Sequence, residues 1–356
     1  MTAELALPSP VDDLAAMNPA LRVAFEGLVA DGIPANTERT YRNLYGRFDQ
    51  WCARQGLQSQ PVTGAALGGY ITHLSSQPES VQPSTLRHLV SVIAAREKAA
   101  GRGGLSGTVA VVADRAIRGH VQRREYGAAQ KAYPLVFGRI RDVAQELDYN
   151  TFIGLRAGLI LSLGYSGAMR VSEQAALRLG DVTPRLGGLN LHFWKSKTDQ
   201  TGRGEDRPIP AGNSVLTDPV TRLREYLEAL ESFGFDISDP TLPLLRAVTS
   251  KGEPRPLLVR KDKRERERAY GGLVGDSIGR IISATCRLAG FPQWESVSGH
   301  SLRAGFATAC AFQQSPHIPL SAWADHGRWV VTSSVPMLYV RDANLVLNNP
   351  LQFVGV

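Results

Sequence analysis

Apolar residues recur at helical spacing through most of the first 126 residues. The clearest run begins after Asn36, a favourable N-cap residue, and Gly56 is placed to end it. The apolar stripe of this helix consists of Tyr41, Leu44, Tyr45, Phe48, Trp51 and Cys52. The same spacing predicts three more helices, at 67–74, from Pro83 onward and over 108–124.

The fourth of these helices has one apolar face, and we interpret His120 as a surface residue outside that face. The residues predicted to point inward are Val109, Val112, Ala113, Ala116 and Ile117. We therefore predict a helical domain over 20–126, preceded by a flexible N-terminus at 1–19 and followed by a linker at 127–134.

The rest of the chain, 135–356, mixes helical and strand periodicity. Residues 189–194 alternate like a strand, and 207–210 predict a return strand whose two prolines mark it as a sheet edge. Residues 260–268 are rich in basic side chains and predict a loop or a hairpin tip near an anion. Predicted helices cover 151–163, 169–179, 216–233, 277–289, 302–313, 319–325 and 332–342. The expected fold is mainly α with a small antiparallel β-sheet, in two domains.

The charge of the chain changes this picture by suggesting a partner. The formal net charge is +7, and 33 of the 40 basic residues are arginine, whose forked guanidinium binds phosphate oxygens in pairs. Two of the N-terminal helices have polar faces that carry Arg39, Arg42, Asn43, Arg47, Arg87 and His88. GC-rich coding remains the alternative explanation for the excess of arginine. A basic helix face is suited to the major groove of DNA, and an ordinary solvated face remains the alternative.

Several classes of protein are disfavoured by residues that the chain lacks. Cys52, Cys286 and Cys310 lie far apart, which argues against a disulfide framework or a structural zinc site. No carboxylate cluster suited to two metal ions is evident, so a magnesium-dependent nuclease is disfavoured, and we expect neither metal nor cofactor. The N-terminus lacks a basic, apolar signal sequence and no apolar run approaches the length of a membrane span, so we expect a cytoplasmic protein.

Candidate chemistry gathers near the C-terminus, between Gly299 and Tyr339. The stretch contains His300-x-x-Arg303 and ends in Tyr339, a combination that suggests a nucleophile with phosphate-binding groups around it. A His-x-x-Arg pair alone proves little, since chance supplies roughly one in a chain of this composition. A second pair does exist, His120 and Arg123.

The order of the motifs separates the two pairs. With Arg170-x-x-Glu173, Lys197 in a strand-loop, His300-x-x-Arg303, Trp329 and Tyr339 in sequence, the chain resembles the tyrosine recombinases, the family of phage integrases, Xer proteins and Cre. The resemblance implies a helical core DNA-binding domain at 20–126 and a catalytic domain at 135–356 that includes a C-terminal tail.

One position departs from the family pattern. The third His or Trp of the family usually stands nine residues before the tyrosine, where this chain has Val330. A one-residue insertion assigns the role to Trp329, and His326 is the alternative.

The resemblance implies a role for each motif residue. Tyr339 is the nucleophile, and because a free phenol has a pKa near 10, only roughly one in a thousand is ionised at neutral pH. Arg170 and Arg303 hold the nonbridging oxygens of the phosphate, and His300 takes or shares the phenol proton. The other implied roles are protonation of the leaving 5′ oxygen by Lys197 (with Lys195 as the alternative), orientation of the site by Glu173 and an indole hydrogen bond from Trp329.

The implied function is that of a site-specific DNA recombinase acting through a 3′-phosphotyrosine intermediate. The resemblance also implies a homotetramer on two DNA duplexes, with strands exchanged through a Holliday junction. A type IB topoisomerase and a DNA-binding regulator with a dead site are the alternatives. The tail at 343–356 is too apolar to hang free, and we favour docking into a neighbouring protomer over folding onto its own domain.

Overall fold

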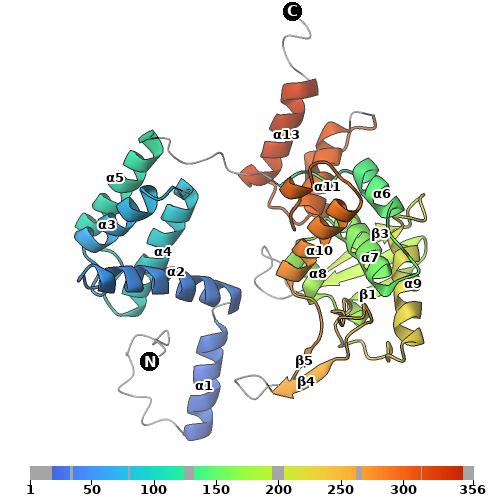
Figure 1. Cartoon of the computed structure of the whole chain (residues 1–356), viewed down its shortest axis with the longest axis horizontal. Helices are drawn as coiled ribbons and strands as arrows, with labels where there is room; N and C mark the ends of the chain where they lie inside the picture. Colours follow the sequence, from blue (N-terminus) through green and yellow to red (C-terminus); the bar gives the residue numbers. More distant parts are fainter. Residues whose placement is uncertain are drawn as a thin grey trace, which may run out of the picture. The chain divides into compact units, whose positions relative to one another are not determined.

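The computed structural model describes residues 18–32, 35–78, 81–123, 132–194, 204–261, 267–313 and 315–347. The chain divides into two units, 1–129 and 130–356 (Figure 1). Each unit has its own apolar core. The dividing point falls inside the stretch that we predicted as a linker. The N-terminal residues 1–17, expected to be flexible, lie outside the described residues.

The described part of the first unit is helical. Its helices are α1 (Pro19–Asp31), α2 (Ala35–Arg54), α3 (Gly64–Ser75), α4 (Pro83–Ala99) and α5 (Gly107–Arg123). The stripe predicted for α2 is confirmed, since Phe48 and Cys52 are fully buried, and Gly56 follows the helix with a positive φ of 66°. Pro83 occupies the first turn of α4, where a missing N–H costs nothing.

Two expectations for α5 are wrong. His120 is buried rather than on the surface, with 3% of its area exposed, and its Nε2 lies 2.8 Å from the carbonyl oxygen of Val81. This bond satisfies the polar end of the ring, so the inward face of α5 accommodates it. Val112 is 36% exposed because it packs on the bare backbone of Gly64 and Gly68, which covers only part of its side chain.

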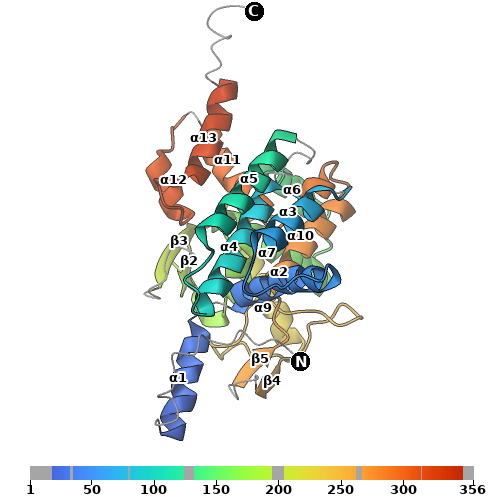
Figure 2. The ribbon, with the colours of Figure 1, turned by 90° about the vertical axis from the view of Figure 1, so that its left-hand side faces the viewer.

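The second unit is built around α7 (Phe152–Ser166), a largely buried helix. Its N-cap residue is Thr151, whose hydroxyl accepts from the N–H of Gly154. Around it lie α6 (Phe137–Gln145), α8 (Val171–Ala176), α9 (Pro219–Ser232), α10 (Gly275–Leu288) and α11 (Ser301–Phe312). Two further helices, α12 (Leu320–His326) and α13 (Ser334–Leu347), pack on α11, and the three lie together in both views (Figures 1 and 2).

The helix predicted at 169–179 is shorter than expected, because α8 ends at Ala176. The backbone beyond it pairs with another segment instead of continuing the helix. Leu177 accepts from the N–H of Leu244, and the N–H of Leu179 donates to Leu242, both at 2.9 Å. A short 3₁₀ turn over Leu179–Asp181 then leads into the sheet.

The sheet is small and antiparallel, with the order β1 (Val182–Arg185), β2 (Gly188–Phe193) and β3 (Glu205–Pro210). The alternation predicted for β2 and the edge position predicted for β3 are confirmed, whereas β1 was not anticipated. Both outer strands contain proline, Pro184 in β1 and Pro208 and Pro210 in β3. A separate hairpin, β4 (Leu258–Lys261) and β5 (Glu267–Tyr270), flanks the basic tip, whose residues 262–266 lie outside the described residues.

The fold is therefore mainly helical with a small antiparallel sheet, as predicted. Within the described ranges, no helix is both long and apolar enough to cross a membrane.

Candidate active site

The site is assembled at the C-terminal end of α7. Three consecutive backbone carbonyls there contact side chains from the last sixth of the chain, and each pair is separated by more than 130 residues. Helix C-termini favour cations and donors because their last carbonyls lack partners within the helix and carry partial negative charge. The pairs are Ser166 with His326, Gly167 with Arg328 and Ala168 with Arg303.

Arg170 and Glu173 stand at the start of α8, immediately after this turn. Glu173 accepts at 2.8 Å from the backbone N–H of Arg170 and also from its guanidinium, so its carboxylate caps the start of α8. Glu173 is buried, and burial alone would raise the pKa of its carboxyl. The charge of Arg328, followed by the Arg170 N–H and guanidinium, outweighs burial and lowers that pKa, so Glu173 is ionised.

Arg303 lies on the first turn of α11 and is 5% exposed. Its Nη1 donates to the carbonyl of Ala168, and its guanidinium lies over the Trp329 ring, 3.9 Å from the centroid. Its Nη2 is buried without a hydrogen-bond partner. Burial and then the charge of Arg170 lower the pKa of Arg303 to about 9, which leaves it charged at neutral pH. The result is a buried cation with one unused donor.

His300 is the N-cap residue of α11 and lies at the surface. Partial removal from water, followed by the charges of Arg303 and Arg170, lowers the pKa of its imidazole. A lowered histidine pKa means that the neutral ring predominates at pH 7, which is the form able to accept a proton.

Tyr339 is half-buried on α13, against the apolar group formed by Ala307, Cys310, Trp323 and Ala324. Its phenol interacts electrostatically with Arg303, whose pKa it raises in opposition to burial. The structure thus brings together Arg170, Glu173, Arg303, Trp329 and Tyr339 with His300 beside them, from the helices α8, α11 and α13 and the loop before α13.

The two candidates for the third motif differ in what they contact. Trp329 covers the Arg303 guanidinium and meets Trp323 edge-on, with 5.7 Å between ring centroids. His326 is engaged elsewhere: its Nε2 lies 2.7 Å from the Ser166 carbonyl oxygen, and its ring stacks on Phe306.

Lys197 and its alternative Lys195 lie outside the described residues. The described strands on either side, β2 and β3, end and begin at Phe193 and Glu205. A bond of 2.8 Å between His192 Nδ1 and Asp206 Oδ1 joins the two strands just before that loop.

The residues predicted to contact DNA belong to the other unit, and all of them are exposed. They are Arg39, Arg42, Asn43, Arg47, Arg87 and His88. An edge contact between Tyr41 and His88, with 6.3 Å between ring centroids, shows that the faces from α2 and α4 adjoin. One member is already paired, because Arg42 lies 2.8 Å from Glu38.

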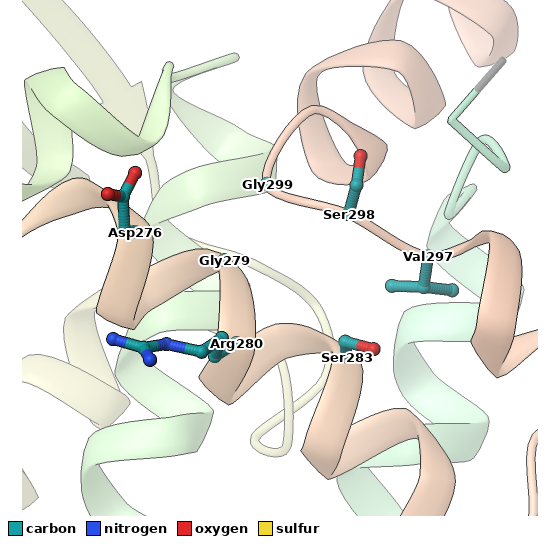
Figure 3. Close-up of a pocket in the computed structure, with 7 residues that line it drawn as sticks. All are labelled: Asp276, Gly279, Arg280, Ser283, Val297, Ser298 and Gly299. Atoms are coloured by element: carbon teal, nitrogen blue, oxygen red, sulfur yellow. The ribbon is translucent and has the colours of Figure 1, made fainter. Parts of the chain in front are cut away.

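An open pocket borders the site at the turn that carries His300 (Figure 3). It lies between α10, which contributes Arg280 and Ser283, and the segment that contains Ser298 and Gly299. In the parts of the chain that the structure describes, no three His, Cys, Asp or Glu side chains gather where they could share a metal ion.

Arg328 is the buried residue that our sequence interpretation missed. It lies one position before Trp329, is 4% exposed and pairs with Glu173 at 2.8 Å. The signal was present as the Gly-Arg-Trp run, but nothing in that run distinguishes a buried arginine from a solvated one.

No family model matches the chain. The chain is 25% identical over 317 residues to an integrase/recombinase xerD homolog from Selenomonas ruminantium, covering 89% of this chain and 84% of the relative. Among solved structures, a lambda integrase dimer bound to a COC′ core site aligns at 13% identity over 88% of this chain and 74% of that chain, with a TM-score of 0.52. A XerA recombinase aligns over 94% of this chain and 98% of that one, at 14% identity and a TM-score of 0.41. The relative and the fold of lambda integrase together identify the chain as similar to the tyrosine recombinases, the Xer proteins and lambda integrase among them.

Proposed function

We propose that the protein is a site-specific DNA recombinase that cuts and rejoins strands through a covalent 3′-phosphotyrosine on Tyr339. The observation that carries this proposal is the state of Arg303. It is a buried cation with an unused Nη2 donor, and it interacts electrostatically with both Arg170 and Tyr339. A buried, unsatisfied donor on a charged group is costly unless a ligand takes it, and a phosphate oxygen fits that requirement.

The proposed reaction is a pair of transesterifications. The Tyr339 oxygen attacks the scissile phosphorus while its proton passes to the neutral imidazole of His300. The bond from phosphorus to the 5′ oxygen breaks, and Lys197 protonates that oxygen as it leaves. A 5′ hydroxyl from the second duplex then attacks the phosphotyrosine and gives its proton to Lys197. The bond from phosphorus to the Tyr339 oxygen breaks, the phenol regains its proton from His300, and a phosphodiester is restored.

The remaining groups stabilise the charge that develops at phosphorus. Arg170 and Arg303 bind the nonbridging oxygens in the pentacoordinate state, and losing one such donor typically costs about 10²–10³ in rate. Trp329 is our choice over His326 for the third motif. Its ring already covers Arg303, whereas the imidazole of His326 is committed to the Ser166 carbonyl.

We further propose that the first unit is the core DNA-binding domain and the second the catalytic domain. The exposed residues of α2 and α4 named above contact the duplex, and four protomers act on two duplexes through a Holliday junction. We expect this activity in the cytoplasm. The integrase structure with which the fold aligns is a dimer bound to a DNA core site, which supports DNA as the partner.

The test begins with Tyr339→Phe protein, which lacks only the nucleophilic oxygen. The DNA that it selects from a random duplex pool identifies the site, and a nicked duplex of that sequence then traps the cleaved state. Wild-type protein should form an adduct that survives SDS, in the presence of EDTA as well, because arginines supply the positive charge. Tyr339→Phe should bind the same DNA without forming any adduct.

Tyr149→Phe is the matched control. This tyrosine stacks on Arg222, away from the site residues, so the variant should form adduct normally. Adduct formation by Tyr339→Phe would contradict the proposal. So would an adduct that requires added magnesium, or wild-type protein that binds DNA and never cleaves it.

A further inference from the structure

Arg328 has an unusual backbone and an unusual position. Its φ is 56°, and among the described residues only it and Ala168, at 44°, are non-glycine residues with positive φ. The two meet, since Arg328 Nη2 lies 3.4 Å from the Ala168 carbonyl oxygen. Side chains rarely adopt this backbone region, and such residues persist where surrounding contacts hold them, often at functional sites.

The contacts that hold Arg328 join three segments. Nη1 donates to the carbonyls of Gly167 and His326, both at 3.1 Å. Nη2 donates to Glu173 Oε2 at 2.8 Å, and the guanidinium carbon lies 4.0 Å from the Phe193 ring centroid on β2. The loop before α13 is thereby fixed to the end of α7, the start of α8 and the sheet.

The charges around Glu173 connect these contacts of Arg328 to the proposed cleavage reaction. Arg170, Arg303 and Arg328 carry three positive charges around the single negative charge of Glu173. Arg328 balances Glu173, which leaves two positive charges for a phosphate whose pentacoordinate state carries two negative ones. Without Arg328, the carboxylate would lose the donor on its Oε2 and would hold the Arg170 guanidinium, which already donates to Oε1, more tightly.

We propose that Arg328 is a positioning residue for strand cleavage. It holds the Glu173 carboxylate so that Arg170 stays available to the phosphate, and it fixes the adjacent Trp329 over Arg303. This inference rests on the proposed function, because it assigns Arg328 a part in that same reaction.

The experiment measures three quantities for each variant: the melting temperature, the affinity for the selected site and the single-turnover rate of adduct formation on the nicked duplex. Arg328→Met should lower the cleavage rate on the order of 10²-fold, the size expected when catalytic groups are displaced, with little change in affinity. Arg328→Lys keeps the charge but loses the fork that reaches Gly167 and Glu173 together, so it should fall between wild type and Arg328→Met.

Two further variants separate positioning from plain stability. Adding Glu173→Gln to Arg328→Met removes the unbalanced carboxylate, and the double variant should cleave faster than Arg328→Met alone. Arg222→Met is the matched control. Arg222 is also buried and paired with a glutamate, Glu225, but it lies on α9 outside the site. This variant should melt at a lower temperature and cleave at the wild-type rate per folded molecule.

Three outcomes would overturn the inference while the proposed function stands: Arg328→Met cleaving at the wild-type rate, a double variant no faster than Arg328→Met, or an equal loss of rate in Arg222→Met. If Arg328→Met fails to fold, the cleavage rates of Arg328→Lys and of the double variant provide the test. Both are expected to cleave more slowly than wild type, and wild-type rates in both would overturn the inference. Wild-type protein that forms no Tyr339-dependent adduct instead defeats the proposed function, and the inference with it.

Discussion

His326 shows how a side chain with catalytic potential can serve packing instead. Its ring lies between the Ser166 carbonyl and Phe306, and the helix that it ends supports the loop bearing Arg328 and Trp329. Burial first, then the charges of Arg328 and Arg207, lowers the pKa of the imidazole, while the bond to Ser166 opposes that shift. The neutral ring is therefore part of the folded state.

This has a consequence for stability below neutral pH. Because the folded pKa of His326 lies below the unfolded value of 6.5, the unfolded chain binds more protons as the pH falls through 6.5. The free energy of unfolding should therefore decrease from pH 7.5 to 5.5, by up to about 1.4 kcal/mol for each unit of pKa lowering. Denaturant titrations across this range measure it.

His326→Gln is the matched variant, since its amide still donates to Ser166 but does not titrate. It should have a shallower dependence on pH than wild type between 7.5 and 5.5. Carboxyls with lowered pKa, such as Glu173, lose their stabilising effect only at lower pH, as the pH falls below about 4.5, and do not confuse the measurement. An unchanged slope in His326→Gln would contradict the assignment.

Individual residues show how much of the site could be predicted from the sequence. Arg170, Glu173, Arg303, Trp329 and Tyr339 were predicted to lie together, and the structure brings them together, because their types and order carry the information. Arg328 was not predicted. Its burial depends on carbonyls more than 150 residues away, and local sequence contains no trace of such a contact.

At the scale of elements, the exposed faces of α2 and α4 give the sharpest prediction. Arg42→Ala and Arg47→Ala should each weaken DNA binding and reduce its dependence on salt concentration, because each lost phosphate contact removes about one unit from the slope. Binding titrations from about 50 to 200 mM salt measure that slope.

Arg118→Ala provides the control for this face. Arg118 is an equally exposed arginine, paired with Asp114 on α5, and it is not among the residues predicted to contact DNA. Its slope should match that of wild type. If the salt dependence of DNA binding is unchanged in Arg42→Ala and Arg47→Ala, the α2 face does not contact DNA and is an ordinary solvated surface.

The elements themselves were largely predictable where apolar residues recur at helical spacing, as in α2 and α4, or form a long apolar run, as in α7. The failures involve backbone pairing. The strand β1 forms a hairpin with β2, which follows it directly, and α8 ends early because Leu177 and Leu179 bond to the distant segment at 242–244. Pairing between distant segments outweighs local preference in such places.

At the scale of the whole molecule, the question is how copies associate. The tail that we expect to dock into a neighbouring protomer continues past α13, and its residues 348–356 lie outside the described residues. Since α13 carries Tyr339 and extends to Leu347, a deletion of 348–356 leaves that helix complete. The deletion should spare binding to one DNA site and impair the joining of two sites and recombination.

Native gels on one-site and two-site DNA distinguish the alternatives for the tail. Full-length protein should assemble tetramers on two-site DNA. The truncated protein should bind a single site but should not join two sites in one complex. A truncated protein that unfolds would show that the tail packs on its own domain. Normal tetramers from truncated protein would show that the tail does not join protomers.

The prolines of the outer strands bear on the same question. Pro184 in β1 and Pro208 and Pro210 in β3 supply no N–H, so neither margin of the sheet offers an unbroken ladder to an incoming strand. Proteins that crowd onto neighbouring sites reach high local concentrations, where open strand margins invite fibre-like polymerisation. Interruption at both edges of the sheet disfavours growth by strand addition. Under the proposed function, the number of copies in an assembly would then be set by the DNA rather than by extension of the sheet.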